Sequence, residues 1–504
     1  MSDQITLTVD NVSTYVHPPL KGALYAEFKK KLGYKPENAV WISNNNPHWD
    51  GWVTTVCYGS GKCRCANKKS EMHFPTGLLS VAKSFFEEKN ISLNVVDSRP
   101  PVSNVAPLEL GSNYSLRYYQ KDILDKALKK QRGIITAATG AGKTVIAGSI
   151  IAKAGAFPAC FFVTTIDLLN QAKSELEKLI VKDNLPIQIG VVGGGKCDIK
   201  DINIITVQTA VRSLGQSFEK FDEEDDMEEE AVDDSKKQAI KNLIESCQMI
   251  ICDEVQHWAA NTCQTVSDFC KKARYRFGIS ATPWRDMSDD ILIDCCFGKE
   301  IANINASKLI EEKVLVTPKI YFVHIKSRMG GTFADVYKRG IVENFYRNNI
   351  IKNLAEQFVE EGRQTLILVR HISHGEILQD MIPNSVFLHG SINSKSRQNS
   401  IEKMKQGKYR CVIASSIFDE GVDVRPLSAL ILAGAGKSQT RALQRIGRVI
   451  RSYEGKKDAI IVDFFDDMKY MKKHSQARRK MYKTEPKFEI SDIEMDIDEK
   501  NESV

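Results

Sequence analysis

Short apolar runs alternate with stretches of helical periodicity over most of the chain after residue 110. Strands are predicted at residues 132–136, 161–165, 204–209, 249–252 and 275–283, and an apolar helix at residues 145–151. Strands that alternate with helices in this way predict a parallel sheet with crossover helices. A second set begins near residue 307, with strands at 364–370 and 410–416. The fold class is therefore α/β, with two tandem parallel-sheet domains.

The first hundred or so residues follow another pattern. Short strand-like runs alternate with turns, and residues 77–86 form one amphipathic stretch of helical spacing. Paired prolines at 100 and 101 indicate a linker, because proline fits neither a helix interior nor a central strand. We expect a small N-terminal α+β domain at 1–107, parallel-sheet domains at 108–305 and 306–470, and a basic then acidic tail at 471–504.

The composition is that of a globular protein, with 42% hydrophobic and 27% charged residues in a chain of 504. Such a length exceeds what one hydrophobic core usually supports. The sequence contains no apolar run of the roughly 18 residues that a membrane span needs, and residues 1–4 lack the features of a signal peptide. The expected location is the cytoplasm, without membrane contact.

Charge is distributed unevenly along the chain. The formal net charge of +6 combines a net −10 over residues 219–235, a net −6 over residues 489–504 and +22 over the rest. A body this basic favours a polyanionic partner such as nucleic acid, and a merely solvated basic surface is the alternative. The acidic run at 219–235 has too few apolar residues to offset its ordering entropy, so we expect a disordered insertion within the first parallel-sheet domain.

Residues 137–144 have the composition of a phosphate-binding loop between a strand and a helix. Gly140 and Gly142 allow backbone N–H groups to approach phosphate oxygens, Lys143 supplies a charge to the outer phosphates, and Thr144 is placed to ligate Mg²⁺. The nucleotide expected here is ATP. The complete set of candidate ATP-binding residues is Arg117, Gln120, Thr139, Gly140, Ala141, Gly142, Lys143, Thr144, Gly421 and Asp423.

Two adjacent acids follow the buried strand at 249–252. Asp253 is placed to hold Mg²⁺, together with Thr144, and Glu254 to orient or deprotonate the attacking water. Gln120 has an amide that both donates and accepts, which suits the Hoogsteen edge of adenine. Ser280 and Thr282, at the end of a later strand, are candidates to sense the acid cluster and relay its state to nucleic acid.

The second parallel-sheet domain has no phosphate loop, but it has residues 444–451. On a helix, Arg448 and Arg451 share one face, and Gln444 lies one turn before Arg448. A guanidinium pair of this kind is suited to stabilise the charge that develops on the γ-phosphate, and a solvated basic helix is the alternative. The candidate catalytic residues are Lys143, Asp253, Glu254, Gln444, Arg448 and Arg451.

Polar residues at strand ends are candidates for contacts with phosphates of nucleic acid, which position a strand without reading its sequence. Tryptophans of the N-terminal domain, with basic residues nearby, are candidates to stack or wedge against bases, and a core role is their alternative. The candidate nucleic-acid contacts are Thr164, Thr165, Thr209, Arg370, His371, Ser415, Trp49 and Trp52.

The twelve cysteines are scattered, and several fall inside apolar strands, which predicts reduced core thiols rather than a disulfide framework. Cys57, Cys63, Cys65 and His73 are close enough in sequence to be considered as a zinc site. Their spacing lacks a C-x-x-C pair, so a structural role without metal is the main expectation.

Taken together, these segments resemble the motifs of superfamily 2 helicases in their usual order, across about residues 112–465. Residue 137 is Ala where the general phosphate-loop pattern has Gly, which is similar to the helicase form of this loop. The matching residues are Gln120; Gly140, Gly142, Lys143 and Thr144; Asp253 and Glu254; Ser280 and Thr282; Gly421 and Asp423; and Gln444, Arg448 and Arg451. The resemblance implies that both parallel-sheet domains are RecA-like.

Residues 116–120 and 280–285 resemble the branch of the superfamily that includes XPB, the RecG-type remodelers and the UvsW-type phage helicases. The N-terminal domain resembles that of the UvsW type. The resemblance implies an ATP-dependent helicase that works as a monomer on forked and four-way DNA in phage-type recombination, repair and replication. Alternatives are an RNA helicase, the double-strand translocase subunit of a restriction or remodeling complex, and a non-enzymatic scaffold. The sequence departs from the family at Gln256, where the acid motif usually has His or Asp, and coupling is the role we assign to Gln256.

Overall fold

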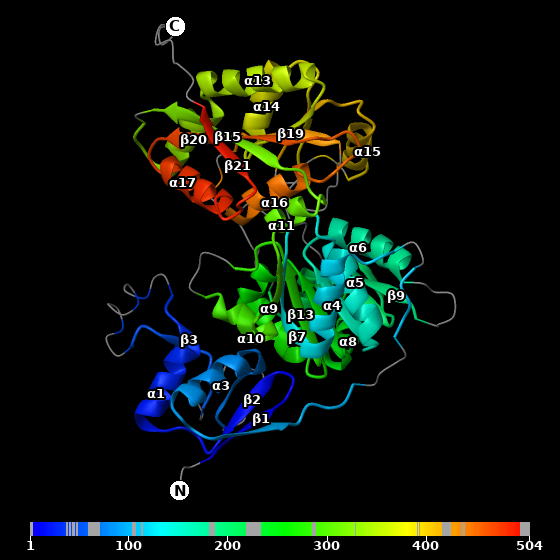
Figure 1. The fold of residues 1–504 in the computed structure, drawn as a ribbon, viewed down its shortest axis with the longest axis vertical. Helices are drawn as coiled ribbons and strands as arrows, with labels where there is room; N and C mark the ends of the chain where they lie inside the picture. The colour runs from blue at the N-terminus through cyan, green and yellow to red at the C-terminus, as the bar shows by residue number, and fades with distance from the viewer. Residues whose placement is uncertain are drawn as a thin grey trace. The chain divides into compact units, whose positions relative to one another are not determined.

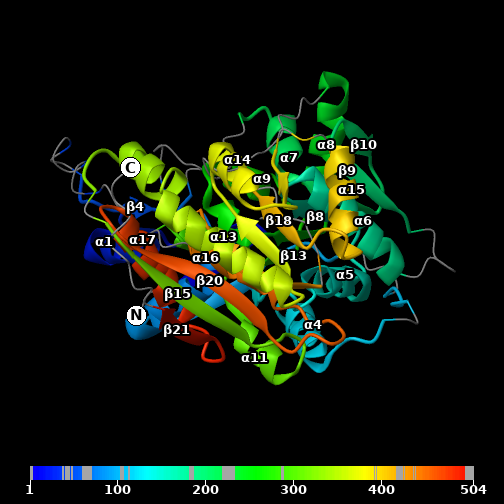
Figure 2. The same ribbon diagram turned by 90° about the horizontal axis from the view of Figure 1, so that it is seen from above.

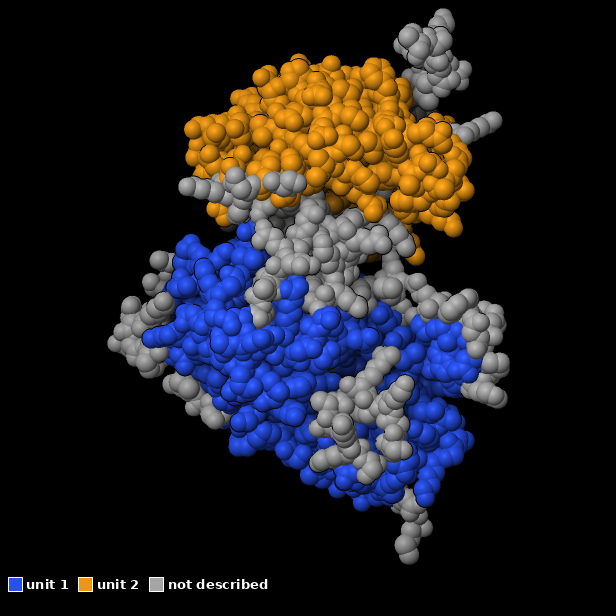
Figure 3. Space-filling model, turned by 180° about the vertical axis from the view of Figure 1, so that it is seen from behind, with its two compact units in different colours: residues 1–137, 142–221, 227–303 blue, residues 138–141, 222–226, 304–504 orange. Residues whose placement is uncertain are grey.

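A computed structural model of the chain describes residues 4–36, 39, 42, 46, 49–58, 71–102, 107–111, 114–180, 187–217, 233–284, 289–327, 329–390, 392, 394–415, 424, 426–434, 436 and 439–493. The chain divides into two compact units, shown in blue and orange in Figure 3. Unit 1 covers most of residues 1–303, and unit 2 covers residues 304–504 together with residues 138–141 of the phosphate loop.

Unit 1 begins with a four-stranded sheet of order β5-β2-β1-β6, in which β1 and β6 are parallel and the other pairs antiparallel. The helices α1 and α3 accompany this sheet, and α3 buries Ala82, Phe85 and Phe86 (Figure 1). The amphipathic stretch at 77–86 is therefore helical, as predicted. The elements are β1 (Ile5–Val9), β2 (Ser13–His17), α1 (Gly22–Lys31), β3 (Gly33–Tyr34), β4 (Val53–Thr54), β5 (His73–Pro75), η1 (Thr76–Leu78), α3 (Leu79–Glu88) and β6 (Leu93–Asp97).

The rest of unit 1 is built on a sheet of order β10-β9-β11-β8-β12-β13-β7-β14, whose described pairs are parallel except β10 with β9. Its strands are β7 (Arg132–Ala137), β8 (Ala159–Val163), β9 (Ile189–Gly193), β10 (Lys196–Asp198), β11 (Ile202–Thr206), β12 (Met249–Asp253), β13 (Tyr275–Ser280) and β14 (Glu300–Ile304). Its helices are α4 (Tyr118–Lys130), α5 (Lys143–Ala154), α6 (Ile166–Leu179), α7 (Val207–Ser213), α8 (Asp234–Ser246), η2 (Val255–Ala259), α9 (Asn261–Phe269) and α10 (Ile291–Phe297). This arrangement confirms the predicted parallel sheet.

The central strands of this sheet determine where the candidate site lies. The strands β12, β13 and β7 are neighbours and run parallel, with Asp253 paired to Ile279 and Ser280 paired to Thr136. Parallel strands place their carboxyl ends at one edge of the sheet. The phosphate loop after β7, the acids that end β12 and the hydroxyls that follow β13 are therefore brought to the same edge.

Several boundaries in unit 1 differ from the sequence prediction, and the strands expected at 161–165 and 275–283 end at Val163 and Ser280. The strand expected at 204–209 ends at Thr206, because the Thr206 hydroxyl caps α7 by accepting from Thr209 N at 3.4 Å. Thr209 is therefore in a helix and not at a strand end. Most of the insertion expected at 219–235 lies outside the described residues, but its last three residues are ordered: Asp233 caps α8, and Asp234 lies in its first turn. Acidic residues stabilise this position because the N-terminus of a helix carries partial positive charge.

The N-terminal sheet and the larger sheet of unit 1 share one hydrophobic core. Phe28 and Phe86 from the first belong to the same cluster of buried residues as Trp258 and Phe297 from the second. Packing is close at the contact, because a Cβ on Gly77 would lie 1.9 Å from the backbone oxygen of Asp294. Residues 1–107 are thus fixed to the first parallel-sheet domain and do not form an independently packed module.

Unit 2 contains a sheet of order β17-β18-β16-β19-β20-β15-β21, in which every described pair is parallel. Figures 1 and 2 show α13 and α14 on one face of it, and Figure 1 shows α16 and α17 on the other. The elements are α11 (Ala306–Glu311), β15 (Pro318–Lys326), α12 (Phe333–Tyr337), η3 (Lys338–Val342), α13 (Phe345–Glu360), β16 (Gln364–Leu368), α14 (Ile372–Met381), β17 (Val386–Leu388), α15 (Ser394–Lys405), β18 (Cys411–Ala414), β19 (Leu427–Leu432), α16 (Gln439–Val449), β20 (Ala459–Asp467), α17 (Met471–Tyr482) and β21 (Glu489–Ile493). Residues 471–493, which the sequence analysis assigns to a tail, are thus folded onto this sheet. No helix in the described part of the chain has the length and apolar composition that crossing a bilayer needs.

Candidate active site

The phosphate loop links β7 to α5 and has the backbone that its glycines predict. Gly140 and Gly142 have φ angles of 93° and 83°, in the left-handed region that favours glycine. Gly142 is the N-cap of α5 and has no side-chain hydrogen bond to the helix. The first N–H groups of α5 are therefore not capped by that residue, and such groups suit phosphate oxygens.

Gln120 lies against this loop from α4. A Cβ on Gly142 would be 2.7 Å from Gln120 Nε2, so the amide and the loop backbone approach closely. Gln120 Oε1 accepts from Arg117 N at 3.0 Å, and the side chain is 5% exposed. The structure thus brings Gln120 next to the loop, and the backbone N–H of Arg117 holds its amide oxygen.

Lys143 is paired with both acids at the end of β12. Its Nζ lies 2.6 Å from Glu254 Oε1 and 3.5 Å from Asp253 Oδ1. The exposed fractions of these side chains are 19%, 12% and 14% respectively, so the three charges are largely removed from water. Buried charges of this kind require mutual compensation. The ammonium group supplies the positive charge that the two carboxylates need.

The pKa values of the acids reflect this pairing. Burial alone would raise the pKa of Glu254, but the charge and hydrogen bond of Lys143 lower it to about 2. Burial raises the pKa of Asp253, and the neighbouring Glu254 adds to that effect while Lys143 opposes it. Lys143, although buried, has its pKa raised by the two acids. Glu254 is therefore ionised at neutral pH, and Asp253 depends most on a nearby cation.

Gln256 connects the acids to the end of the next strand. Gln256 Nε2 donates to Glu254 Oε2 at 3.1 Å, and Ser280 Oγ donates to Gln256 Oε1 at 2.7 Å. Ser280 Oγ also accepts from Thr282 N at 3.1 Å. An amide has one donor and one acceptor end, so a glutamine at this place joins Glu254 to Ser280. The departure of residue 256 from the family pattern preserves a link between the two motifs.

Glu254 has a backbone conformation that is uncommon for a residue with a side chain. Its φ is 47°, in the left-handed region, where it precedes the short helix η2. Conformations of this kind cost about 1–3 kcal/mol, and the surrounding structure must hold them in place. The hydrogen bond from Glu254 N to Asp253 Oδ1, at 3.0 Å, and the contact with Gln256 provide that restraint.

In unit 2, the helix that carries the candidate arginines is shorter than predicted. Gln444 and Arg448 lie on α16, which ends at Val449. Arg451 is beyond it and forms an isolated β-bridge with Leu315, with a hydrogen bond from Val316 N to Ile450 O of 2.8 Å. The prediction that Arg448 and Arg451 share one helix face is therefore wrong, because pairing with the segment before β15 ends the helix first.

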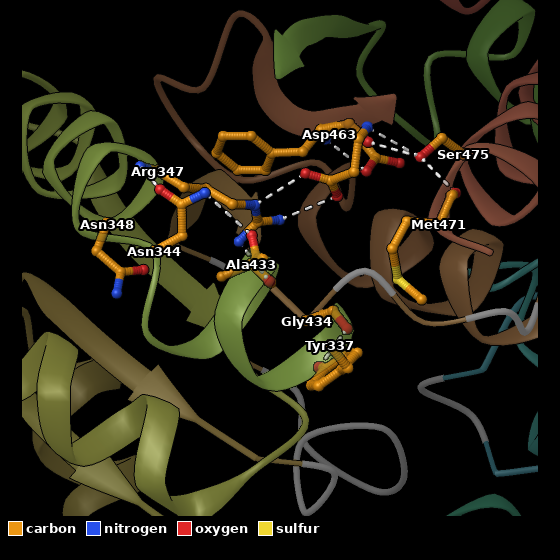
Figure 4. Close-up of polar contacts among 12 residues, drawn as sticks. Tyr337, Asn344, Arg347, Asn348, Ala433, Gly434, Asp463, Met471 and Ser475 are labelled. Atoms are coloured by element: carbon orange, nitrogen blue, oxygen red, sulfur yellow. Dashed lines mark hydrogen bonds and ion pairs between the residues drawn. The ribbon is translucent and has the colours of Figure 1, made fainter. Parts of the chain in front are cut away.

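A buried ionic network holds the segment that leads into α16, and Figure 4 shows the part of it around Arg347. Arg347 of α13 donates to Asp466 at 3.0 Å and to Ala433 O at 2.8 Å, and its guanidinium lies 4.1 Å from the Phe464 ring centre. Arg478 of α17 donates to Asp463 at 2.8 and 2.9 Å and to Gly436 O at 2.8 Å. The arginines thus fix backbone carbonyls between β19 and α16. The sequence gives no signal for this role, because isolated arginines on amphipathic helices usually face solvent.

The residues predicted to contact nucleic acid differ in their exposure and in their local contacts. Thr164 and Thr209 are 3% and 4% exposed, and the Thr165 hydroxyl accepts from Leu168 N as the cap of α6. The Arg370 guanidinium lies 5.6 Å from the Tyr337 ring centre, and the exposed His371 is the residue at the N-cap position of α14. Ser415 follows β18 and is 4% exposed. The candidates Gly421 and Asp423 lie outside the described residues.

The two candidate tryptophans are linked to each other. Trp49 Nε1 donates to Trp52 O at 2.9 Å, and Lys35 Nζ lies 5.5 Å from the Trp52 ring centre. Both side chains are partly exposed. Neither is therefore fully buried in the core.

Of the residues considered for zinc, Cys57 and His73 pair as an isolated bridge, and His73 Nδ1 contacts Glu71 O at 2.8 Å. Cys63 and Cys65 lie outside the described residues. Within the described ranges, no group of three or more His, Cys, Asp and Glu side chains is arranged to hold a metal ion.

The chain matches two known protein families. The family described as the res subunit of type III restriction enzymes matches residues 113–285, and the helicase conserved C-terminal domain matches residues 347–453. The first match contains the phosphate loop and both acids, and the second contains Gln444, Arg448 and Arg451.

Individual relatives have low sequence identity to this chain, but they align with most of its length. The DNA 3'-5' translocase XPB2 of Sulfurisphaera tokodaii is 26% identical over 429 residues, which are 76% of this chain and 87% of that protein. The ATP-dependent DNA helicase uvsW of Enterobacteria phage T4 is 22% identical, over 72% of this chain and 71% of the other. Among solved structures, Dbp5 of S. cerevisiae bound to RNA and ADP BeF3 aligns with a TM-score of 0.52 at 14% identity, over 75% of this chain and 89% of that one. Two RecA-like domains, with the motifs in their expected order, thus account for most of the chain. The chain belongs to the superfamily 2 helicases, the ATP-dependent enzymes that the sequence motifs indicated.

Proposed function

We propose that this helicase remodels branched DNA, namely forks and four-way junctions, and that hydrolysis of Mg²⁺-ATP drives the remodeling. The observation that carries the ATP part of the proposal is the pairing of Lys143 with Asp253 and Glu254 at one edge of the sheet. The basic charge of the body and the DNA activities in the names of the relatives XPB2 and uvsW support DNA as the track.

Lys143 has two sets of partners in the proposed cycle. Without nucleotide it neutralises the acids, and with ATP its ammonium turns to the outer phosphates. Asp253 and Thr144 then offer oxygen atoms, the ligands that Mg²⁺ prefers, and the ion would neutralise phosphate charge when bound. Glu254, already ionised, accepts a proton from the attacking water. Arg448, Arg451 and Gln444 act on the γ-phosphate in the same step.

Gln256 couples this chemistry to the DNA track. A change in the charge near Glu254 alters its hydrogen bond to Gln256 and, through it, the position of Ser280 and Thr282 at the end of β13. Phosphate contacts by Thr165, Arg370 and His371 would then be made and released in turn. Thr164, Thr209 and Ser415 contribute mainly to packing, since all three are nearly inaccessible.

The N-terminal domain is the proposed element that separates strands at the branch. It shares a core with the first RecA-like domain, so movement of that domain carries the N-terminal domain with it. Trp49 and Trp52, partly exposed and close to Lys35, are suited to contact unstacked bases. We propose that the enzyme works as a monomer on DNA, in the cytoplasm.

Unwinding assays on single-stranded, forked and four-way DNA test the proposal. We expect ATP-dependent strand separation on forks and junctions, and stronger stimulation of ATP hydrolysis by DNA than by RNA of the same sequence. Preferential unwinding of RNA duplexes would instead favour an RNA helicase.

A double-strand translocase is the second candidate, because residues 113–285 match the res subunit family of type III restriction enzymes. Displacement of a triplex-forming strand from unbranched duplex DNA, without strand separation, would favour this function.

A further inference from the structure

A cavity of about 460 Å³ lies inside unit 1, between the N-terminal domain and the helices α9 and α10. Residues of the N-terminal domain, including Tyr25, Tyr34 and Tyr58, line it on one side, and Asp268 and Gln264 of α9 line it on the other. Ligand pockets in proteins are typically about 300–1,000 Å³ and combine aromatic walls with a few polar groups. The cavity has both features, and the helicase chemistry described above uses none of its residues.

Asp268 is the acidic side chain among the residues that line the cavity. Among the described residues its carboxyl has no hydrogen bond or ion pair, and burial raises its pKa to about 7, while Arg276 opposes that effect. The Arg276 guanidinium does not pair with it, because it donates to Ser267, Ala273 and Cys270. The Asp268 side chain is half-buried at the cavity wall. A carboxyl that is partly withdrawn from water is stabilised by hydrogen-bond donors, so it is well placed to bind those of a ligand.

The tyrosines supply planar surface beside this carboxyl. The Tyr25 and Tyr58 rings have centroids 6.0 Å apart and meet edge to face at 70°, and Tyr58 is 42% exposed. Lys29 Nζ lies 5.1 Å from the Tyr25 ring centre, and Lys35, next to Tyr34 in the chain, contacts Trp52. Aromatic rings with lysines among them are the combination that binds single-stranded nucleic acid, through stacking on bases and attraction of phosphates.

We propose that this cavity binds a single unpaired nucleobase, with Tyr25 and Tyr58 against its ring and Asp268 on its Watson–Crick edge. We expect this base to be one that is displaced from DNA at a branch. In this respect the inference rests on the proposed function. A base held there would keep the separated strand from pairing again.

The chemistry of Asp268 predicts which bases bind best. Guanine has adjacent N1–H and N2–H groups, and an ionised carboxylate accepts from both. Adenine and cytosine place an amino group beside a ring nitrogen that accepts, so they match a protonated carboxyl, which donates once and accepts once. Thymine has one N–H between two carbonyl oxygens, which repel a carboxylate. The expected order therefore has guanine first and thymine last.

Equilibrium binding to forked DNA without ATP tests this inference separately from unwinding. Forks with all-thymine arms are compared with forks that carry one guanine, placed in turn at each unpaired position next to the branch. For the natural chain we expect about ten-fold tighter binding at one guanine position. Asp268→Asn, which loses an acceptor oxygen, should abolish the preference, and Tyr58→Ala should weaken binding of both forks.

The matched control is Asp125→Asn, which changes an exposed acid of α4 and should keep the preference. Guanosine 5'-monophosphate in the same assay distinguishes the two sources of a base. If millimolar guanosine 5'-monophosphate fails to compete with the fork, the ligand is a base within DNA. If it competes at micromolar concentration, the cavity has the proposed chemistry and its ligand is a free nucleotide. Equal binding of all forks by the natural chain, or an unchanged preference in Asp268→Asn, would overturn the inference. Failure of the proposed function would appear only in the ATP-dependent assays.

Discussion

Ser280 Oγ donates a 2.7 Å hydrogen bond to Gln256 Oε1, which joins the end of β13 to the acid motif after β12. Gln256 also holds Glu254, the proposed base for water attack, through its amide nitrogen. One side chain thus contacts both the hydrolytic carboxylate and the strand end that is proposed to report on DNA. This relationship makes residue 256 the most direct point at which to separate hydrolysis from movement.

Substitution Gln256→Ala should uncouple the two activities. Glu254 and Lys143 remain, so we expect ATP hydrolysis to fall only several-fold, whereas base pairs separated per ATP should fall by at least ten-fold. Gln256→His, which supplies a donor and an acceptor of similar reach, is the matched variant and should retain most of the coupling. A constant ratio of unwinding to hydrolysis in Gln256→Ala would show that the link is only structural.

Removal of the ammonium in Lys143→Ala should abolish ATP hydrolysis and leave junction binding intact. It should also destabilise unit 1 without nucleotide, by about 3–5 kcal/mol, because two buried carboxylates lose their cation. The measurement is denaturant unfolding at pH 7 together with a steady-state ATPase assay. Undiminished turnover would refute the assignment of the phosphate loop.

The same pairing predicts a loss of stability in acid. The pKa of Glu254 is about 2 in the folded chain and about 4.3 in an unfolded one. Because the folded value is the lower one, the stabilisation is complete above about pH 4.3 and is lost as the pH falls toward 2. Unfolding free energies measured from pH 6 to pH 3 should show a smaller acid-dependent loss in Glu254→Gln.

Asp268 should have the opposite effect on stability. Its folded pKa of about 7 lies above the ordinary value of about 3.9. The folded chain therefore binds a proton more tightly than the unfolded chain, and stability falls as the pH rises from about 4 to about 7. Asp268→Asn should remove this dependence and gain on the order of 1–3 kcal/mol at pH 8. A fall in the variant as large as in the natural chain would contradict the assignment of this pH dependence to Asp268.

The buried ionic network in front of α16 should contribute strongly to stability. Arg478→Met leaves Asp463 buried without its ionic partner, so we expect a loss of about 3–5 kcal/mol of unfolding free energy. Arg479→Met, the neighbouring residue whose pair with Asp492 is partly exposed, should cost no more than about 1 kcal/mol. Denaturant unfolding measures both variants. Equal losses of unfolding free energy would contradict the claim that the buried pair with Asp463 stabilises the fold more than the exposed pair does.

Much of the candidate site was predictable because its chemistry lies in short segments. The phosphate loop, the acids and Ser280 each follow an apolar run, and parallel strands bring the ends of such runs together. The position of Gln256 in the acid motif predicts a coupling role, but the sequence does not predict its hydrogen bond with Ser280. These two residues are close only because β12 and β13 are neighbouring strands.

The parts that the sequence did not predict depend on contacts between distant residues. Residues 207–209 continue an apolar strand pattern, and only the capping by Thr206 shows that a helix begins there. The charged segment after residue 471 suggests a solvated tail, whereas its Arg478 is buried against Asp463. The cavity has walls from both ends of unit 1, so periodicity and motifs give no sign of it.

Strand separation on a DNA fork and a four-way junction, with and without Mg²⁺-ATP, is the most direct measurement of the central claim. The account predicts that the natural chain separates both substrates only with Mg²⁺-ATP, and that Lys143→Ala binds them without separating them. Hydrolysis of ATP with no separation or migration of either substrate would contradict it.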